Sequence, residues 1–163
     1  MPGRELNQNR RLIGTMLRVL SSPAIPVMAA EAGLDFLTLD MEHGGYDWPQ
    51  LSGLAIACRG AGLALFVRVP ALTADHVTRV LGCGAGGVIA PSVEAVEQAR
   101  DLVTMVKYPP QGRRPFASVG GHTAYRATML SADVLRDMNT QSVAVAEIDT
   151  PAGVENAAEI ASV

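Results

Sequence analysis

Short apolar runs alternate with longer stretches of mixed polarity along the chain. The apolar runs are rich in Leu, Val and Ile and are bounded by Gly, Pro or Asp, which is typical of buried strands. They predict five strands, at residues 12–19, 36–43, 63–70, 87–93 and 142–149. Strands alternating with helices at this spacing predict a parallel sheet with right-handed crossovers, an α/β fold.

The stretches between the strands carry signals for helix starts. Residues 94–107 place apolar side chains at helical spacing, with glutamates in the first turn and a lysine at the end, as the helix dipole favours. A polar residue before proline predicts a capped first turn. The expected caps are Ser22 before Pro23, Thr73 before a helix with Val77, Val80 and Leu81 on one face, and Thr150 before Pro151 and a last helix running to the C-terminus.

Two architectures fit this alternation, an open doubly wound sheet and a (β/α)8 barrel of the TIM type. No G-x-G-x-x-G follows the first strand, and GCGAGG at 82–87 precedes a strand, so it predicts a tight turn instead of a nucleotide cradle. We therefore expect the barrel. A barrel of about 250 residues has about 31 per unit, so this chain holds about five of the eight βα units. Residues 1–163 are expected to be a single domain, the N-terminal part of a barrel whose C-terminal strands are missing.

Composition narrows the functional classes. Aromatic residues make up only 4% of the chain, the net charge is −3, and the basic residues are scattered, so no nucleic-acid surface is expected. Cys58 and Cys83 are expected to be reduced thiols. The polar N-terminus, MPGRELNQNRR, lacks the apolar core of a signal peptide, and no apolar run reaches the ~20 residues that span a bilayer. The prediction is a soluble cytoplasmic protein without membrane contact.

Residues 108–130 form a segment that packing does not explain. The stretch is rich in Gly and Pro and is too long for a plain connection. Loops of this length are usually lids, binding loops or subunit contacts, although a solvated loop without function remains an alternative.

Polar side chains gather at the ends of three predicted strands. In a βα barrel the C-terminal strand ends form the active site, so such residues are candidates for catalysis. Taken singly, each has a structural explanation, as a loop histidine or an ion-pair partner, but three neighbouring strand ends favour a functional set. The candidates are Asp40, Glu42 and His43 after the second strand, Arg68 on the third, and Glu147 and Asp149 on the fifth, two apart and hence on one face.

Several stretches containing these residues resemble one family. GTMLRVLSSPAIPVMAAEAGLDFLTLDMEHGG is similar to the opening of the HpcH/HpaI aldolases, and the likeness continues through FVRVP, GGVIAPSVEAVEQAR, KYPPQGRR and EIDTPAGVENAAEI. These are metal-dependent class II pyruvate aldolases, such as 4-hydroxy-2-oxoheptanedioate aldolase and 2-dehydro-3-deoxyglucarate aldolase. The chain resembles roughly the N-terminal two-thirds of such an enzyme.

The resemblance implies a carbon–carbon lyase that cleaves 4-hydroxy-2-oxo acids to pyruvate and an aldehyde, or runs the reverse addition, through a pyruvate enolate. It also implies a homo-oligomer, usually a hexamer, and a divalent cofactor: Mg²⁺, Mn²⁺ or Co²⁺. By resemblance His43 is the base, Asp40 orients its ring, Arg68 holds the pyruvate oxygens, and Asp149 is the first metal carboxylate. A cation and a guanidinium suit a developing enolate charge, and histidine titrates near neutral pH.

The chain departs from the family pattern at the expected metal site. The family has Glu where Asp149 stands, and often Gln where Glu147 stands, so Glu147 is either a substitute ligand or an acidic neighbour. The family's Gly-Pro-x-Asp-Leu segment, with the second metal carboxylate, is not found up to Val163. Activity of these residues alone is therefore an open question.

Two other functions remain open at this stage. One is an acyl-CoA lyase related to the citrate lyase β subunit, which shares the fold. The other is a catalytically impaired scaffold that lacks a complete metal site. The loop at 108–130 and the DMEH strand end favour the aldolases. The aldehyde partner, the preferred metal and the direction of the reaction are not predicted.

Overall fold

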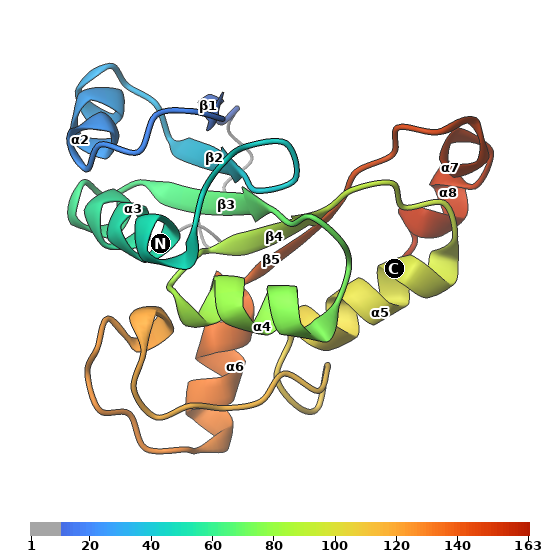
Figure 1. The fold of residues 1–163 in the computed structure, drawn as a ribbon. Coiled ribbons are helices and arrows are strands. Elements are labelled where there is room, and N and C mark those ends of the chain that lie inside the picture. Colours follow the sequence, from blue (N-terminus) through green and yellow to red (C-terminus); the bar gives the residue numbers. More distant parts are fainter. Residues whose placement is uncertain (1–10) are drawn as a thin grey trace.

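The computed structural model describes residues 11–163, so the polar N-terminal stretch lies outside it except for Arg11. Strands and helices alternate as predicted (Figure 1). The strands are β1 Gly14–Leu17, β2 Phe36–Asp40, β3 Ala64–Arg68, β4 Gly87–Ala90 and β5 Val143–Ala146. The helices are α2 Ala24–Glu31, α3 Trp48–Gly60, α4 Ala74–Gly82, α5 Val96–Val106, α6 Ala132–Gln141, α7 Pro151–Glu155 and α8 Ala157–Ile160, with a 3₁₀ turn, η1, at Gly121–Thr123.

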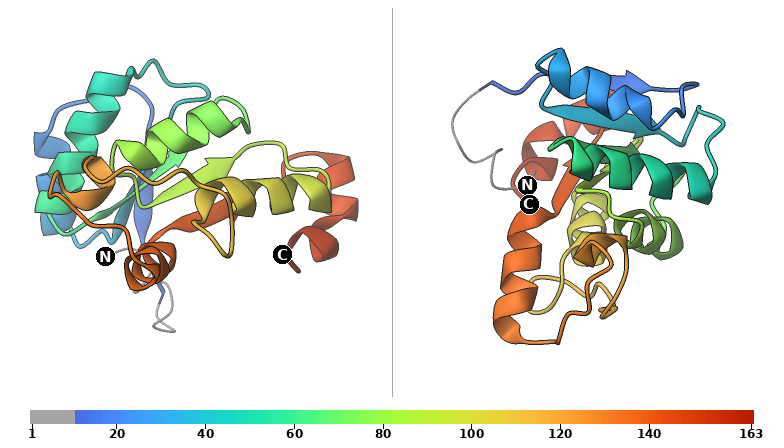
Figure 2. Two further views of the ribbon diagram at one scale, coloured as in Figure 1. Left: turned by 90° about the horizontal axis from the view of Figure 1, so that it is seen from below. Right: turned by 90° about the vertical axis from the view of Figure 1, so that its left-hand side faces the viewer.

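The five strands form one parallel sheet in the order β1-β2-β3-β4-β5. Each strand pairs with the next one along the chain, whereas a doubly wound sheet reverses its order partway. The helices after β1 to β4 lie side by side along one face of the sheet (Figures 1 and 2). This is the arrangement of a TIM-type barrel wall, and it confirms the α/β prediction with five βα units.

The core lies between the sheet and this helix layer. Leu37 and Leu39 of β2 and Val67 of β3 are fully buried. They belong to one apolar cluster with side chains of α3, α4 and α5, including Val77, Val80 and Leu81 of the predicted α4 face. Since side chains alternate along a strand, Phe36, Asp40 and Arg68 lie on the opposite face, which faces the barrel interior.

The strands end earlier than predicted, and turn chemistry explains why. In β2 the predicted strand ran to His43, but Asp40 Oδ1 accepts hydrogen bonds from the backbone N–H groups of Glu42 and His43, both at 3.1 Å. This Asx turn takes the chain out of the sheet. The candidates on the second and fifth strands therefore lie partly in loops that follow the strands.

The helix starts follow the sequence signals with one shift. Thr73 and Thr150 cap α4 and α7 by accepting from the N–H groups of His76 and Gly153. Ser22 is not the N-cap that was expected, because α2 begins at Ala24 and Pro23 occupies the N-cap position; the Ser22 hydroxyl accepts from Ala24 N–H at 3.3 Å from one residue further back.

The sequence analysis expected one continuous last helix, and this expectation was wrong. The helix breaks into α7 and α8 at Asn156, whose side chain donates to the carbonyl of Glu94 at 2.8 Å.

The 108–130 segment and α6 lie at the N-terminal end of the strands, away from α7 and α8 at the C-terminal end (Figures 1 and 2). The sequence analysis assigned no element to α6, which is capped by Ser131. A lid over Asp40 and Arg68 is excluded, since these residues lie at the other end of the sheet.

The tight turn predicted at 82–87 is confirmed, with Gly84 at a φ of +105°. Both cysteines are free thiols; Cys58 is buried in α3, which raises its pKa to about 12. Within residues 11–163, no helix has the length and apolarity to cross a bilayer.

Candidate active site

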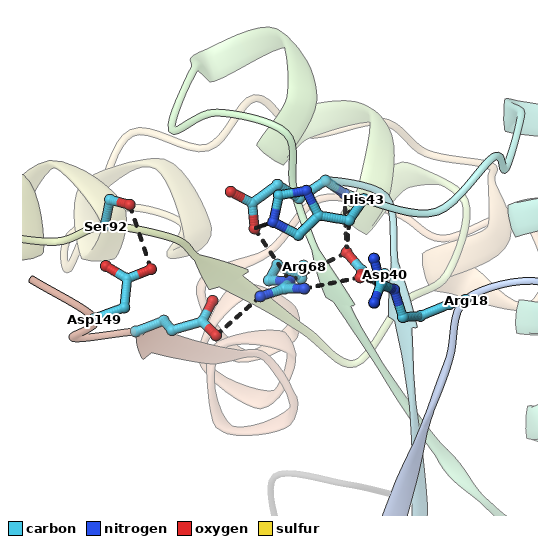
Figure 3. Close-up of polar contacts among 8 residues, drawn as sticks. Arg18, Asp40, His43, Arg68, Ser92 and Asp149 are labelled. Atoms are coloured by element: carbon cyan, nitrogen blue, oxygen red, sulfur yellow. Dashed lines mark hydrogen bonds and ion pairs between the residues drawn. The ribbon is translucent and has the colours of Figure 1, made fainter.

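The register of β2 and β3 brings the candidates Asp40 and Arg68 together. Asp40, at the end of β2, pairs with Arg68, at the end of β3, in the ladder. Arg68 grips the carboxylate with two hydrogen bonds, from Nε to Oδ1 at 3.1 Å and from Nη2 to Oδ2 at 2.8 Å (Figure 3). A bidentate, charge-assisted contact of this kind is strong and fixes the orientation of both groups.

Asp40 is the buried centre of the site, with no exposed side-chain surface. Burial by itself raises the pKa of Asp40, but the hydrogen bonds from Arg68 and from the backbone of His43 and Glu42 outweigh it and lower the pKa to about 2. Asp40 is therefore a carboxylate at neutral pH.

The turn that follows Asp40 requires glycine. A Cβ atom on Gly44 would lie 2.1 Å from the carbonyl oxygen of Asp40 and 2.9 Å from that of Arg18. Only glycine allows the backbone after DMEH to pass so close to the ends of β1 and β2.

Arg68 lies among three carboxylates. Besides Asp40, its Nε lies 3.2 Å from Glu42 Oε2, and its Nη1 donates to Glu147 Oε1 at 3.1 Å. The hydrogen bond to Asp40 raises the pKa of Arg68 most, and the negative charges of Glu147, Asp40 and Glu42 add to it against the opposing effect of burial. Since a guanidinium has five N–H groups, donors remain on both terminal nitrogens.

His43 lies above Arg68 in Figure 3, with its side chain 58% exposed and its Nε2 3.7 Å from Glu42 Oε2. By resemblance, Asp40 was expected to hydrogen-bond to the imidazole ring of His43, and the structure shows a different contact. Asp40 bonds to the backbone N–H of His43 instead, because the Asx turn folds the main chain over the carboxylate. Asp40 therefore positions His43 through the backbone.

Arg18 is a member of the site that the sequence analysis missed. It follows β1, and its Nε lies 3.1 Å from Asp40 Oδ2, while its side chain is 57% exposed (Figure 3). The signal was available, since Arg18 is a charged residue at the end of a predicted strand, the rule that selected Arg68. Glu42, to which the sequence analysis gave no role, also belongs to the charged cluster around Arg68.

The two acidic residues after β5 have different surroundings. Glu147 joins Arg68, and its second oxygen, Oε2, is buried without a hydrogen-bond partner among the described residues. Asp149 is exposed and accepts a hydrogen bond of 3.4 Å from Ser92, a residue with a positive φ of 52° at the end of β4 (Figure 3). Such strained positions gather at functional sites.

These two residues partly fit a divalent cation. Carboxylate oxygens are the ligands that Mg²⁺ and Mn²⁺ prefer, and the unpaired oxygen of Glu147 is of that kind. Within residues 11–163, however, no three His, Cys, Asp or Glu side chains come together as a metal site. The described residues thus offer part of a ligand set.

Taken together, the C-terminal strand ends carry two arginines, four acids and an exposed histidine. The family model described as HpcH/HpaI aldolase/citrate lyase matches residues 15–163. The chain belongs to this family. Asp40, His43, Arg68 and Glu147 all lie within the matched range.

Several proteins similar to this chain are named as aldolases. The chain is 33% identical over 150 residues to 4-hydroxy-2-oxovalerate aldolase of Novosphingobium aromaticivorans, covering 88% of this chain and 54% of the relative. It is 34% identical over 151 residues to 2-dehydro-3,6-dideoxy-6-sulfogluconate aldolase of Pseudomonas putida, covering 93% and 58%. The chain thus spans little more than half the length of these relatives.

A solved family structure has the same fold. The crystal structure of an HpcH/HpaI aldolase from Desulfitobacterium hafniense DCB-2 superposes with a TM-score of 0.90 at 31% identity, covering 98% of this chain and 61% of that one. The five βα units of this chain therefore correspond to about three-fifths of a complete HpcH/HpaI aldolase.

Proposed function

We propose that this chain is part of a class II aldolase that cleaves 4-hydroxy-2-oxo acids to pyruvate and an aldehyde, or catalyses the reverse addition. The observation that carries the proposal is the Asp40–Arg68 pair at adjacent strand ends, with His43 beside it. The family membership and the aldolase names of the relatives support it.

In this proposal His43 removes a proton from the methyl group of pyruvate. Its imidazole is exposed on the same face as Arg68 and carries no charge when it acts as a base. Asp40 keeps the turn in place through the backbone of Glu42 and His43. The backbone that carries the base is thereby fixed to the end of β2.

Arg68 would bind the oxygens on which negative charge develops. Its contacts with Asp40 and Glu147 fix the guanidinium plane, and its remaining N–H donors are available for the substrate. A planar fork held in advance suits two oxygens of a 2-oxo acid better than a mobile ammonium does.

Glu147 and Asp149 are the residues proposed to hold the divalent ion, Mg²⁺, Mn²⁺ or Co²⁺. The orphaned Oε2 of Glu147 favours the view that Glu147 is a ligand and not merely an acidic neighbour. When bound, the ion would supply a Lewis acid for the enolate oxygen. A complete enzyme would be a cytoplasmic homo-oligomer, a hexamer if it follows the family.

Pyruvate release from a 4-hydroxy-2-oxo acid, such as 4-hydroxy-2-oxovalerate, tests this proposal. The assay is run on the complete gene product with EDTA and after readdition of Mn²⁺. We expect release that EDTA abolishes and Mn²⁺ restores. Cleavage of an acyl-CoA ester without pyruvate release would support the lyase alternative, and no turnover with either substrate would support the scaffold alternative.

A further inference from the structure

A cavity lies at the opposite end of the sheet from the candidate active site. Its volume is about 710 Å³, within the usual range for small-molecule sites. Its walls are the end of α3, the starts of β3 and β4, the 108–130 segment and α6. All of these elements lie within the described chain, on the helix-covered side of the sheet.

Arg114 is a buried cation in the wall of this cavity. It is only 7% exposed, and its guanidinium stacks 4.6 Å from the centre of the Tyr108 ring. No carboxylate among residues 11–163 forms an ion pair with it. Burial lowers the pKa of Arg114, yet a guanidinium stays protonated in proteins. A buried charge of this kind calls for an anion.

Tyr108 adds a hydrogen-bond donor beside Arg114. Its hydroxyl is buried and has no hydrogen-bond partner among the described residues. Its backbone is fixed to α6, because Asn139 accepts from Tyr108 N–H at 2.7 Å and donates to Tyr108 O at 3.0 Å. Lys107 Nζ also donates to the carbonyl of Asn139, at 2.7 Å. The wall that carries Arg114 and Tyr108 is therefore held in place without a ligand.

The rest of the lining combines positive charge with apolar surface. Arg59 and Arg126 add positive charge. Asp133 forms an ion pair with Arg136 at 2.9 Å, and Asp137 accepts from Gln141 at 2.6 Å and keeps its negative charge, so the arginines Arg59, Arg114 and Arg126 outnumber the acids of the lining. The apolar part of the lining includes Leu63, Leu65, Val134 and Met138. This pattern suits an anion that carries a hydrocarbon body.

We propose that this cavity binds a small organic carboxylate. The carboxylate group lies on Arg114 and Tyr108, and the hydrocarbon body lies against Leu65, Val134 and Met138. The site is separate from the Asp40–Arg68 cluster, because the two occupy opposite ends of the same strands. Its occupation does not require the aldolase reaction.

Calorimetric titration with three probes tests the proposal. Benzoate has the charge and the apolar body, benzamide has the same shape without the charge, and inorganic phosphate has charge alone. We expect benzoate to bind wild type saturably. The affinity of wild type for benzamide, and of Arg114→Gln for benzoate, should be lower by about tenfold or more, which is the scale for loss of a charged hydrogen bond. Phosphate should bind more weakly than benzoate.

Matched variants separate binding from folding. Arg100→Gln removes an exposed arginine of α5, and Arg68→Lys alters the other site, so both should keep the wild-type affinity for benzoate. Met138→Trp fills the cavity from α6 without touching Arg114, and it should lose benzoate with an unchanged circular dichroism spectrum. The proposal would be overturned if benzoate showed no saturable binding, or if it bound folded Met138→Trp or Arg114→Gln as tightly as wild type. Benzamide binding as tight as that of benzoate, or phosphate binding tighter than that of benzoate, would overturn it as well.

Discussion

At the scale of single residues, one buried carboxylate organises the site. Asp40 accepts hydrogen bonds from Arg68 and from two backbone N–H groups and forms an ion pair with Arg18, so both of its oxygens are engaged. A group engaged in this way positions its neighbours, and in the proposed function the groups that it holds, Arg68 and His43, face the substrate. Predictions at this scale concern Arg68 and Asp40.

Arg68→Lys should behave as a severe change, although it keeps the charge. Lysine cannot bind Asp40 through two parallel hydrogen bonds and also reach Glu147. We expect kcat/KM for a 4-hydroxy-2-oxo acid to fall by about 10²-fold or more, the scale for loss of a preorganised electrostatic donor. Arg79→Lys, on the exposed face of α4, is the control. Similar kcat/KM values for Arg68→Lys and wild type would give Arg68 a structural role only.

The depressed pKa of Asp40 predicts a loss of stability in acid. The unfolded value is 3.8 and the folded value about 2, so the carboxylate stabilises the fold fully above pH 4 and loses this effect as pH falls through 2. The difference corresponds to about 2 kcal/mol. Urea unfolding of wild type and Asp40→Asn should therefore differ by about this amount at pH 6 and converge near pH 2. Asp75→Asn, in an exposed ion pair, should show little difference at either pH. A gap that persists unchanged at pH 2 contradicts this prediction.

Much of the site was predictable at this scale, and the remainder has a physical reason. Asp40, His43 and Arg68 follow from the rule that strand ends carry chemistry, and the ladder pairs two of them. The contact of Asp40 with backbone instead of with the His43 ring was not predictable, because it depends on the turn that ends β2. Arg18 could have been found by the same strand-end rule, and the pairing of β1 with β2 places it beside Asp40.

At the scale of elements, the turn after β2 controls the site. Gly44→Ala would force a Cβ atom to within 2.1 Å of the Asp40 carbonyl oxygen, and the backbone must move. We expect a loss of about 2 kcal/mol or more in unfolding free energy, at the upper end of overpacking costs. Gly53→Ala is the control, since a Cβ there meets nothing within 4 Å inside α3 and should stabilise the helix by about 0.5–1 kcal/mol. Equal stability of the two variants would contradict this account of the turn.

The element predictions succeeded at most local signals, with the cap expected at Ser22 as an exception. The five strands and the caps at Thr73 and Thr150 have local sequence signals. The α6 helix was missed although Ser131 is a local cap signal, and distant contacts fix its position, since Asn139 holds Tyr108 and Lys107 reaches its C-terminal end. The break at Asn156 likewise depends on the carbonyl of Glu94, 62 residues away in sequence.

At the scale of the whole molecule, the sheet of the described residues has two unpaired edges. β1 pairs with β2 alone and β5 with β4 alone. Unpaired edge strands favour association with other chains. A polypeptide of these 163 residues should therefore self-associate in size-exclusion chromatography with light scattering, increasingly so with concentration. A monodisperse monomer at all concentrations would contradict this expectation.

In the proposed function, His43 and its neighbours generate the enolate of pyruvate. Proton–deuterium exchange at the methyl group of pyruvate, followed by NMR in D₂O with Mg²⁺, reports this step without any aldehyde. The complete gene product should catalyse exchange, and His43→Ala should lower its rate by about 10²-fold or more while metal binding persists. His76→Ala, in the first turn of α4, should exchange at the wild-type rate. Exchange by His43→Ala at the wild-type rate, or none by the wild type with metal bound, would contradict the claim.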